Sequence, residues 1–284
     1  MAGLQKSSTP PPLDLILPAT SANLGPAFDA AALALALYLK VQAAPADDFS
    51  LSAEGRDAEL CRAMENNLIL QTYREVLAQA GKPVVPLRLR VSNEIPIGKG
   101  CGSSAAARLA GIALAVHFGN LNLTAEEIIS KASTREGHPD NAAACWLGGL
   151  VIARLSDNSR GGATLQASHI TNSCPWPLLL AIPEKALSTE EARRVLPQQY
   201  SRADAVTNIQ NSMFLLAAFV QSRTDLLRSA LQDRLHEPYR APFTGLVDIV
   251  EPTSDNSVYN GRAKFRGREF GQFELRKLAG RGLS

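Results

Sequence analysis

Short runs of apolar residues, some alternating with polar ones, predict several β-strands along the chain. Residues 87–91 alternate apolar and basic side chains, which is the period-two pattern of a strand with one buried face. Residues 13–17 predict another short strand, and the compact apolar runs at residues 150–153 and 177–182 predict two more.

Between these strands, apolar residues recur with the period of an α-helix. Residues 67–80 show this period and stop at Gly81, a residue type that commonly follows the end of a helix. Thr124, with Glu127 three residues later, forms a capping-box pattern that predicts a helix to about Ser133. Further helices are expected at residues 189–196, where Pro197 stops the pattern, at 203–222 and at 225–232.

One apolar run fits two kinds of element. Residues 30–39 are wholly apolar and predict a buried helix, although the end of the run, residues 37–43, fits a strand equally well. The run is about half the length that a membrane span needs, so no membrane partner is expected.

The order of these elements predicts an α/β protein with two domains. Residues 1–12 are polar and end in three prolines, which indicates a disordered lead-in. The polar, glycine-containing stretch at residues 156–163 is the expected boundary between a first domain, residues 13–158, and a second domain, residues 159–246. Residues 247–284 form an unpatterned tail, because neither a helical nor a strand period runs through them.

Composition and charge exclude several classes of partner. Apolar residues make up 45% of the 284 residues and charged ones 20%, as in an ordinary soluble globular protein. The net charge of +2 predicts no nucleic-acid partner and no charged membrane surface. The cysteines, Cys61, Cys101, Cys145 and Cys174, are widely spaced and form no C-x-x-C pair, which argues against a zinc site and for a reducing compartment. The absence of a signal-peptide pattern predicts a cytoplasmic protein.

A glycine-rich loop at residues 94–107, EIPIGKGCGSSAAA, carries the clearest chemical signal. It follows the predicted strand at residues 87–91 and precedes an alanine- and leucine-rich run. Glycines let a backbone approach a phosphate, and the unpaired N–H groups of a first helical turn attract anions. Ser103 or Ser104 is a candidate helix cap, and Lys99 adds a positive charge. A turn without a ligand remains an alternative. The Walker pattern is absent, and the match to the dinucleotide pattern G-x-G-x-x-A is weak.

Three segments in this order resemble the GHMP kinases, and within them the homoserine kinases. They are PATSANLGPAFD at residues 18–29, IPIGKGCGSSAA at 95–106 and EGHPDN at 136–141. Segments around Arg193 and Arg240 are similar to the second half of that family. The resemblance implies a two-layer α/β domain that binds ATP, a ferredoxin-like second domain, and transfer of the ATP γ-phosphate to the side-chain hydroxyl of L-homoserine. It also implies a homodimer as one expected assembly.

The resemblance further implies which residues bind the nucleotide and the metal ion. Ser104 and Glu136 would hold Mg²⁺, with Glu126 or Glu127 as competitors for Glu136. The residues expected at the nucleotide are Asn67 near the adenine and Pro96, Ile97, Gly98, Lys99, Gly100, Cys101, Gly102, Ser103, Ser104, Ala105 and Ala106 around the phosphates.

A second group is implied at the amino-acid substrate. It comprises Asn23, Asp29, His138, Asn141, Arg193 and Arg240, with the two arginines at the substrate carboxylate. Asn141 would orient the hydroxyl, Lys99 would assist at the phosphates, and no general base is assigned. Simpler roles stay open: Asp29 as a cap, His138 as a loop histidine, and Arg193 with Arg194 as partners of a helix dipole.

Two departures from the family pattern change the expectation. Ala27 stands where a glycine is usual, which would cost about 1 kcal/mol if that position had a positive φ. The glycine-rich motif that ends the family is missing, and the change to the tail is abrupt, as after a frameshift or truncation. We therefore also consider a protein with weak or no kinase activity, and a sister kinase that acts on another small alcohol.

Overall fold

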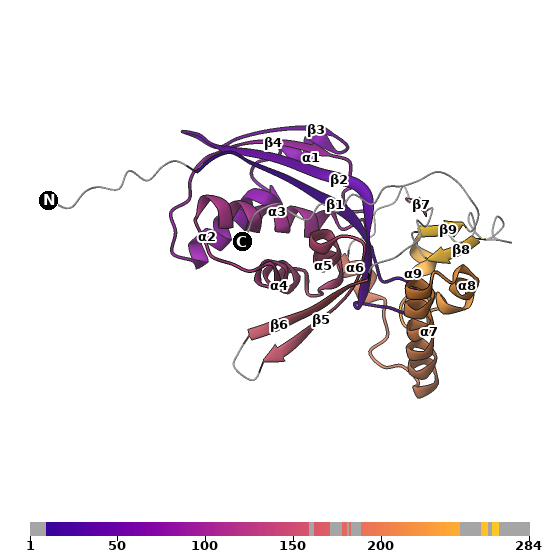
Figure 1. Ribbon diagram of the computed structural model, residues 1–284. Helices are drawn as coiled ribbons and strands as arrows, with labels where there is room; N and C mark the ends of the chain where they lie inside the picture. The colour runs from indigo at the N-terminus through magenta and orange to yellow at the C-terminus, as the bar shows by residue number, and fades with distance from the viewer. Residues whose placement is uncertain are drawn as a thin grey trace.

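The computed structural model describes residues 10–158, 162–170, 178–180, 182, 189–244, 257–260 and 263–266. It has a larger part, made of a six-stranded sheet with helices, and a smaller part dominated by helices α7, α8 and α9 (Figure 1). The predicted α/β class is confirmed. None of the helices within these ranges combines the length and the apolarity that crossing a membrane requires.

The larger part is built around strand β2 (Ala31–Pro45). The strand order is β3-β4-β2-β5-β6, and β1 also pairs with β2. The other strands are β1 (Leu13–Ala22), β3 (Ser50–Gly55), β4 (Leu87–Asn93), β5 (Leu150–Asn158) and β6 (Gly162–Ile170). The β3–β4 pair is parallel and the remaining pairs are antiparallel.

The helix predicted at residues 30–39 is therefore wrong, because this segment is the first half of β2. Ala32 and Leu35 belong to the main core, whereas Ala31 belongs to a second core beside α7 and α8. A strand that is buried on both faces has a continuous apolar sequence, and the period-two pattern is lost. The alternation returns in the second half of β2, where residues 39–43 alternate between buried and exposed.

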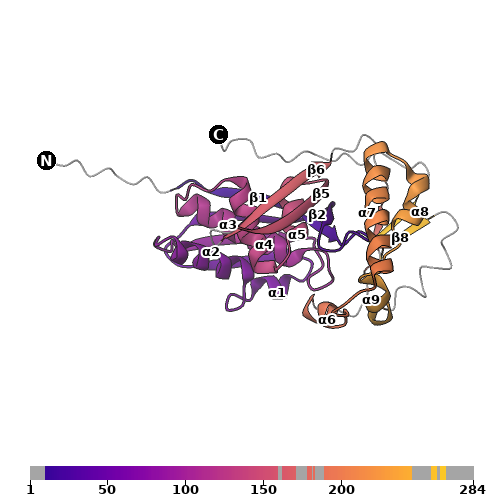
Figure 2. The ribbon, with the colours of Figure 1, turned by 90° about the horizontal axis from the view of Figure 1, so that it is seen from below.

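Helices fill the space between strands β1–β4 and the β5–β6 hairpin (Figure 1). They are α2 (Leu68–Gln79), α3 (Ser103–Phe118), α4 (Ala125–Glu136) and α5 (Asp140–Leu147), with a short α1 (Ala58–Arg62) after β3. The view from below in Figure 2 has β5 and β6 in front of α4 and α5. The predicted helices at 67–80 and 124–133 are confirmed, including the Thr124–Glu127 capping box. Neither α1 nor α5 was expected from the sequence.

The expected domain boundary at residues 156–163 overlaps the end of β5 and the start of β6, while residues 159–161 lie outside the described residues. Leu150 pairs with Ile170, and the pairing continues to Asn158 and Gly162. A domain limit at residue 158 would separate two paired strands, so the first sheet extends to Ile170.

The smaller part confirms the three predicted helices with small changes at their ends. Helix α6 spans Thr189–Arg194 and α7 spans Arg202–Gln221, and the third is a 3-10 turn (Thr224–Leu226) followed by α8 (Leu227–Ala230). Helix α9 (Glu237–Thr244) was not expected.

The tail contributes regular structure, contrary to the sequence expectation. Strand β9 (Ala263–Arg266) lies between β7 (Leu178–Leu180) and β8 (Ser257–Asn260). The rest of residues 247–284, the lead-in at residues 1–9 and Cys174 lie outside the described residues. A ferredoxin-like second domain remains a prediction.

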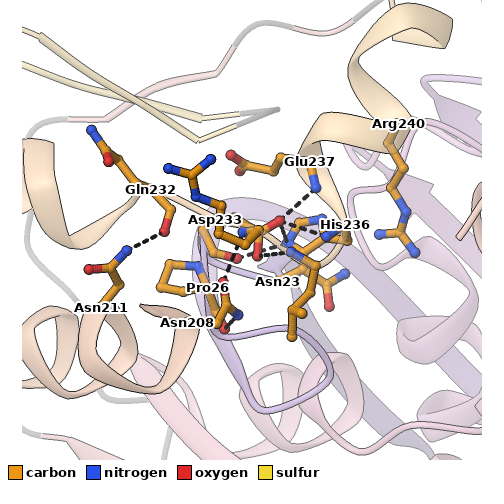
Figure 3. Close-up of polar contacts among 12 residues, drawn as sticks. Asn23, Pro26, Asn208, Asn211, Gln232, Asp233, His236, Glu237 and Arg240 are labelled. Atoms are coloured by element: carbon orange, nitrogen blue, oxygen red, sulfur yellow. Dashed lines mark hydrogen bonds and ion pairs between the residues drawn. The ribbon is translucent and has the colours of Figure 1, made fainter. Parts of the chain in front are cut away.

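The loop between β1 and β2 joins the two parts. Pro26 O accepts hydrogen bonds from Asn208 Nδ2 at 2.8 Å and from Ser212 Oγ at 3.0 Å, and Gly25 O lies 2.8 Å from His236 Nε2 (Figure 3). Gly25 has a φ of +52°, and a Cβ at this position would lie 2.5 Å from Leu231 O. This loop therefore depends on a glycine for its close approach to α8.

Asp233 and Glu237 lie at the start of α9, close to this loop (Figure 3). The Asp233 carboxylate accepts hydrogen bonds from the backbone N–H groups of Leu235, His236 and Glu237, and so caps the helix. Glu237 Oε1 is buried and has no hydrogen-bond partner in the described structure. Burial, together with the neighbouring charge of Asp233, raises the pKa of Glu237 from 4.5 to about 8.

Replacing Glu237 by glutamine should stabilise the protein at alkaline pH. Because the pKa of Glu237 is raised in the folded protein, the unfolded chain releases this proton first as the pH rises, and the stability of the wild type falls between about pH 4.5 and 8. Glu237→Gln should raise the free energy of unfolding by about 1–3 kcal/mol at pH 8 and have little effect at pH 4.5. Urea unfolding across this pH range measures the difference. Glu190→Gln, at an exposed ion pair with Arg194, is the control. The expectation would be contradicted if the free energy of unfolding changed with pH in the same way in the wild type and in Glu237→Gln.

Candidate functional site

The glycine loop connects β4 to α3 and is held against β1. Gly98, Gly100 and Gly102 all have φ near +70°, a conformation that glycine adopts without steric cost. Thr20 N donates a hydrogen bond to Cys101 O at 3.0 Å. Gly102 precedes the first turn of α3, and neither serine caps the helix with its side chain, contrary to the expectation for Ser103 or Ser104. The backbone N–H groups of this turn are those that a bound anion can use.

A Cβ at Gly102 would collide with two side chains from distant segments. It would lie 1.9 Å from Thr20 Oγ1 and 3.2 Å from Asn141 Oδ1. Thr20 Oγ1 itself donates a hydrogen bond of 2.6 Å to Asn141 Oδ1. The glycine loop, β1 and the start of α5 therefore meet at one point.

Ser104 and Glu136, the predicted metal-binding pair, contact each other. Ser104 Oγ donates to Glu136 Oε2 at 2.7 Å, and Arg108 Nε donates to Glu136 Oε1 at 2.6 Å. The alternatives lie elsewhere in α4: Glu127 forms the capping box with Thr124, and Glu126 is exposed in the first turn. Of the three glutamates, the described contacts link only Glu136 to Ser104.

His138 and Asn141 flank Asp140, which is fully buried. Asp140 Oδ1 lies 2.5 Å from His138 Nδ1 and accepts the backbone N–H of Asn141 at 2.7 Å. Burial alone would lower the pKa of His138, but the hydrogen bond and charge of Asp140, with the charge of Asp29, outweigh it and raise the pKa. Asp140 Oδ2 is buried with no partner in the described structure.

Asp29 and Arg193 form a bidentate ion pair between the two parts of the protein. Arg193 Nη2 and Nη1 lie 2.6 and 3.0 Å from the two carboxylate oxygens of Asp29. Asn23 Oδ1 accepts the backbone N–H of Asp29 at 2.8 Å, and both residues have a positive φ. Arg194, in contrast, pairs with Glu190 on the surface. Of the two arginines, Arg193 is therefore the one at the candidate site.

Phe28 lies at the centre of the cationic side of the site. The guanidinium carbons of Arg240 and Arg193 lie 5.0 and 5.4 Å from the centre of its ring, and His236 stacks on it at 5.2 Å. Arg240 Nε also donates to Ala192 O at 2.8 Å. A ring face attracts cations and keeps the two arginines close together. No local sequence signal points to this role, because a single phenylalanine is ordinarily a core residue.

The structure differs from two further expectations, the place of Asn67 near the adenine and the strain at Ala27. Asn67 caps α2 through Oδ1, while Nδ2 donates to Cys61 O, so its side chain serves the helix. Ala27 is absent from the residues with positive φ, and the strain expected for alanine there does not arise. Asp57, which the sequence did not single out, accepts the backbone N–H of Ile97 at 3.0 Å and thus holds the start of the glycine loop.

Comparisons with known proteins find relatives in sequence and in structure. A family model described as GHMP kinases N terminal domain matches residues 67–149. A homoserine kinase of Solibacter usitatus is 41% identical over 83% of this chain and 77% of its own length. One of Deinococcus radiodurans is 36% identical over 86% of this chain and 78% of its own length. The solved structure of a putative homoserine kinase from Listeria monocytogenes is 29% identical, with a TM-score of 0.67, over 89% of this chain and 86% of that one.

Gly102→Ala should disrupt the point where the glycine loop, β1 and α5 meet. The new methyl group would collide with Thr20 Oγ1, and alanine would also have to adopt a positive φ. We expect a loss of about 1–3 kcal/mol in the free energy of unfolding. Binding of a fluorescent ATP analogue should weaken by at least about tenfold, which corresponds to about 1.4 kcal/mol.

Gly81→Ala is the matched control for this substitution. Gly81 also has a positive φ of +63°, but a Cβ there would meet no atom within 4 Å. It should therefore show the backbone cost alone and leave nucleotide binding unchanged. Equal effects of the two substitutions on nucleotide binding would contradict the role of Gly102.

Proposed function

Because this chain belongs to the homoserine kinase family of the GHMP kinases, we propose that it transfers the γ-phosphoryl group of ATP to the side-chain hydroxyl of L-homoserine. The observation that carries the proposal is the contact of Gly102 in the glycine loop with Thr20 and Asn141. A loop suited to phosphates thus lies against Asn141, the side chain assigned to orient the accepting hydroxyl. Phosphoryl transfer depends mainly on such positioning and on charge stabilisation.

At the nucleotide, we assign the phosphates to the backbone N–H groups around Gly98–Ser104 and to the positive charge of Lys99. Three alternating glycines with left-handed backbone conformation (Gly98, Gly100 and Gly102) and a helix N-terminus support this assignment. Asn67 would act indirectly, through the helix that it caps.

The chemistry of Ser104 and Glu136 fits Mg²⁺. Magnesium prefers oxygen ligands and is commonly held by one or two carboxylates together with substrate phosphates. The hydroxyl and carboxylate oxygens lie 2.7 Å apart, at the start of the helix that follows the glycine loop. When bound, the ion would offset the negative charge of the phosphates.

At the amino acid, we assign Asp29 and Asn23 to the ammonium group and Arg193 and Arg240 to the α-carboxylate. Asp29 and Arg193 pair with each other in the free protein. The ammonium group of an α-amino acid could replace Arg193 at Asp29, and its carboxylate could replace Asp29 at Arg193. His138, whose pKa is raised by the hydrogen bond and charge of Asp140, would face the amino acid. Asn141 would orient the hydroxyl, and no residue is assigned as a general base.

The other candidate functions have less support. The similarity to homoserine kinases covers more than four fifths of the chain, which does not favour an inactive descendant. A sister kinase that acts on an alcohol without an α-amino acid group would leave at least one member of the Asp29–Arg193 pair without a substrate partner. A homodimer and a cytoplasmic location remain predictions.

The activity is tested with a coupled assay for ADP, using L-homoserine and a panel of other small alcohols. We expect turnover on L-homoserine within the usual range of kinases, ~1–100 s⁻¹. Absence of turnover on L-homoserine, or faster turnover on an alcohol without an α-amino acid group, would contradict the proposal.

Asp29→Asn tests the assignment of the ammonium site. The substitution removes the negative charge that the ammonium group needs, so KM for homoserine should rise by about 10- to 100-fold, a loss typical of a charged hydrogen bond. KM for ATP should stay within about twofold, because Asp29 lies on the amino-acid side. Asp225→Asn, at an exposed ion pair with Arg223, is the control. Equal changes in both KM values would sink the assignment.

A further inference from the structure

Arg108 lies four residues after Ser104 on α3, so both side chains leave the same face of the helix. Both reach Glu136, the last residue of α4. Ser104 Oγ donates to Oε2 of Glu136 at 2.7 Å, and Arg108 Nε donates to Oε1 at 2.6 Å. Each carboxylate oxygen therefore has one partner from α3.

The position of Glu136 in its own helix does not explain its charge. A carboxylate at the C-terminal end of a helix faces the negative end of the helix dipole, which is unfavourable. Its side chain is only 10% exposed, and that of Arg108 is 22% exposed. Arg108 forms the one ion pair that the structure describes for Glu136. The carboxylate is thus held in place by α3.

This ion pair changes what an approaching metal ion meets. The charges of Glu136 and Arg108 cancel, and Ser104 is neutral, so the three side chains together carry no net charge. A divalent cation then gains little from this site alone. Nucleotide phosphates would supply the missing negative charge, while Oε1 stays with Arg108 and Oε2 remains on the side of Ser104.

We propose that Arg108 is a positioning residue that neutralises Glu136 in the free protein, so that the divalent cation binds only together with the nucleotide. This inference rests on the proposed metal site at Ser104 and Glu136. It adds that Arg108 determines the order of binding: the ion binds together with the nucleotide and does not bind to the protein beforehand.

The test measures binding of Mn²⁺ to the whole 284-residue chain by electron paramagnetic resonance, with and without a non-hydrolysable ATP analogue. The wild type should bind Mn²⁺ much more tightly with the analogue. Arg108→Met keeps an apolar stem and removes the charge. It should tighten Mn²⁺ binding without nucleotide by at least about tenfold, because a positive charge that repels the cation from a few Å away is removed. Arg108→Gln removes the charge but keeps a hydrogen-bond donor. It should act in the same direction if the methionine variant folds poorly.

Arg135→Met is the matched control, because Arg135 is the neighbouring arginine on α4 and its partners are Glu75, Gln79 and Lys131 O. It should leave Mn²⁺ binding unchanged. If Arg108 served only to connect α3 to α4, its substitution would lower thermal stability without tightening the binding of Mn²⁺ in the absence of nucleotide. Unchanged or weaker nucleotide-free binding in both Arg108 variants would overturn the inference.

The proposed metal site has its own readout. Ser104→Ala and Glu136→Gln should each weaken Mn²⁺ binding in the presence of the analogue. If neither does, the metal site itself is wrong, and the inference about Arg108 falls with it. A weakening in these two variants with no response in the Arg108 variants would refute the inference alone.

Discussion

The candidate site depends on Thr20, a fully buried residue that holds three segments together. Its backbone N–H binds Cys101 O in the glycine loop, its hydroxyl binds Asn141 at the start of α5, and its side chain fills the space that a side chain at position 102 would need. Because β1 is paired along β2, this contact places the glycine loop against the central sheet. The distance between the two proposed substrates is thus set by the rigid core of the larger part.

Much of the fold was predictable, because most helices carry a local signal. The capping box at Thr124 and the periodicity after Asn67 were read correctly. Strand β2 was read wrongly because its first half packs against one core on each face, and no local pattern can report a neighbour that is distant in sequence. Of the short strands formed by the tail, β9 was missed for the same reason, since it pairs with the distant β7, whereas β8 pairs with its neighbour β9 and each of the two is only four residues long.

The residues of the candidate site were predictable from motifs, whereas their partners were not. Asp29, Arg193 and Glu136 are predictable because they lie in segments that resemble the family. Phe28 and Arg108 carry no comparable signal, and their contacts appear only when α3, α4 and the loop after β1 come together in space. Motifs report chemistry that faces a ligand, while the residues that orient those groups are specified by the packing.

The Asp29–Arg193 ion pair also has a consequence for ligand discrimination. A simple amine would have to displace the guanidinium from Asp29 and would leave Arg193 without its anion. A hydroxy acid would have to displace Asp29 from Arg193 and would leave Asp29 without its cation. Only a molecule that carries both charges at the spacing of an α-amino acid avoids an unpaired charge in a partly enclosed site. If the proposed assignment holds, the Asp29–Arg193 ion pair would compete with the ligand, and ligands with only one of the two charges would lose more binding energy than the proposed substrate.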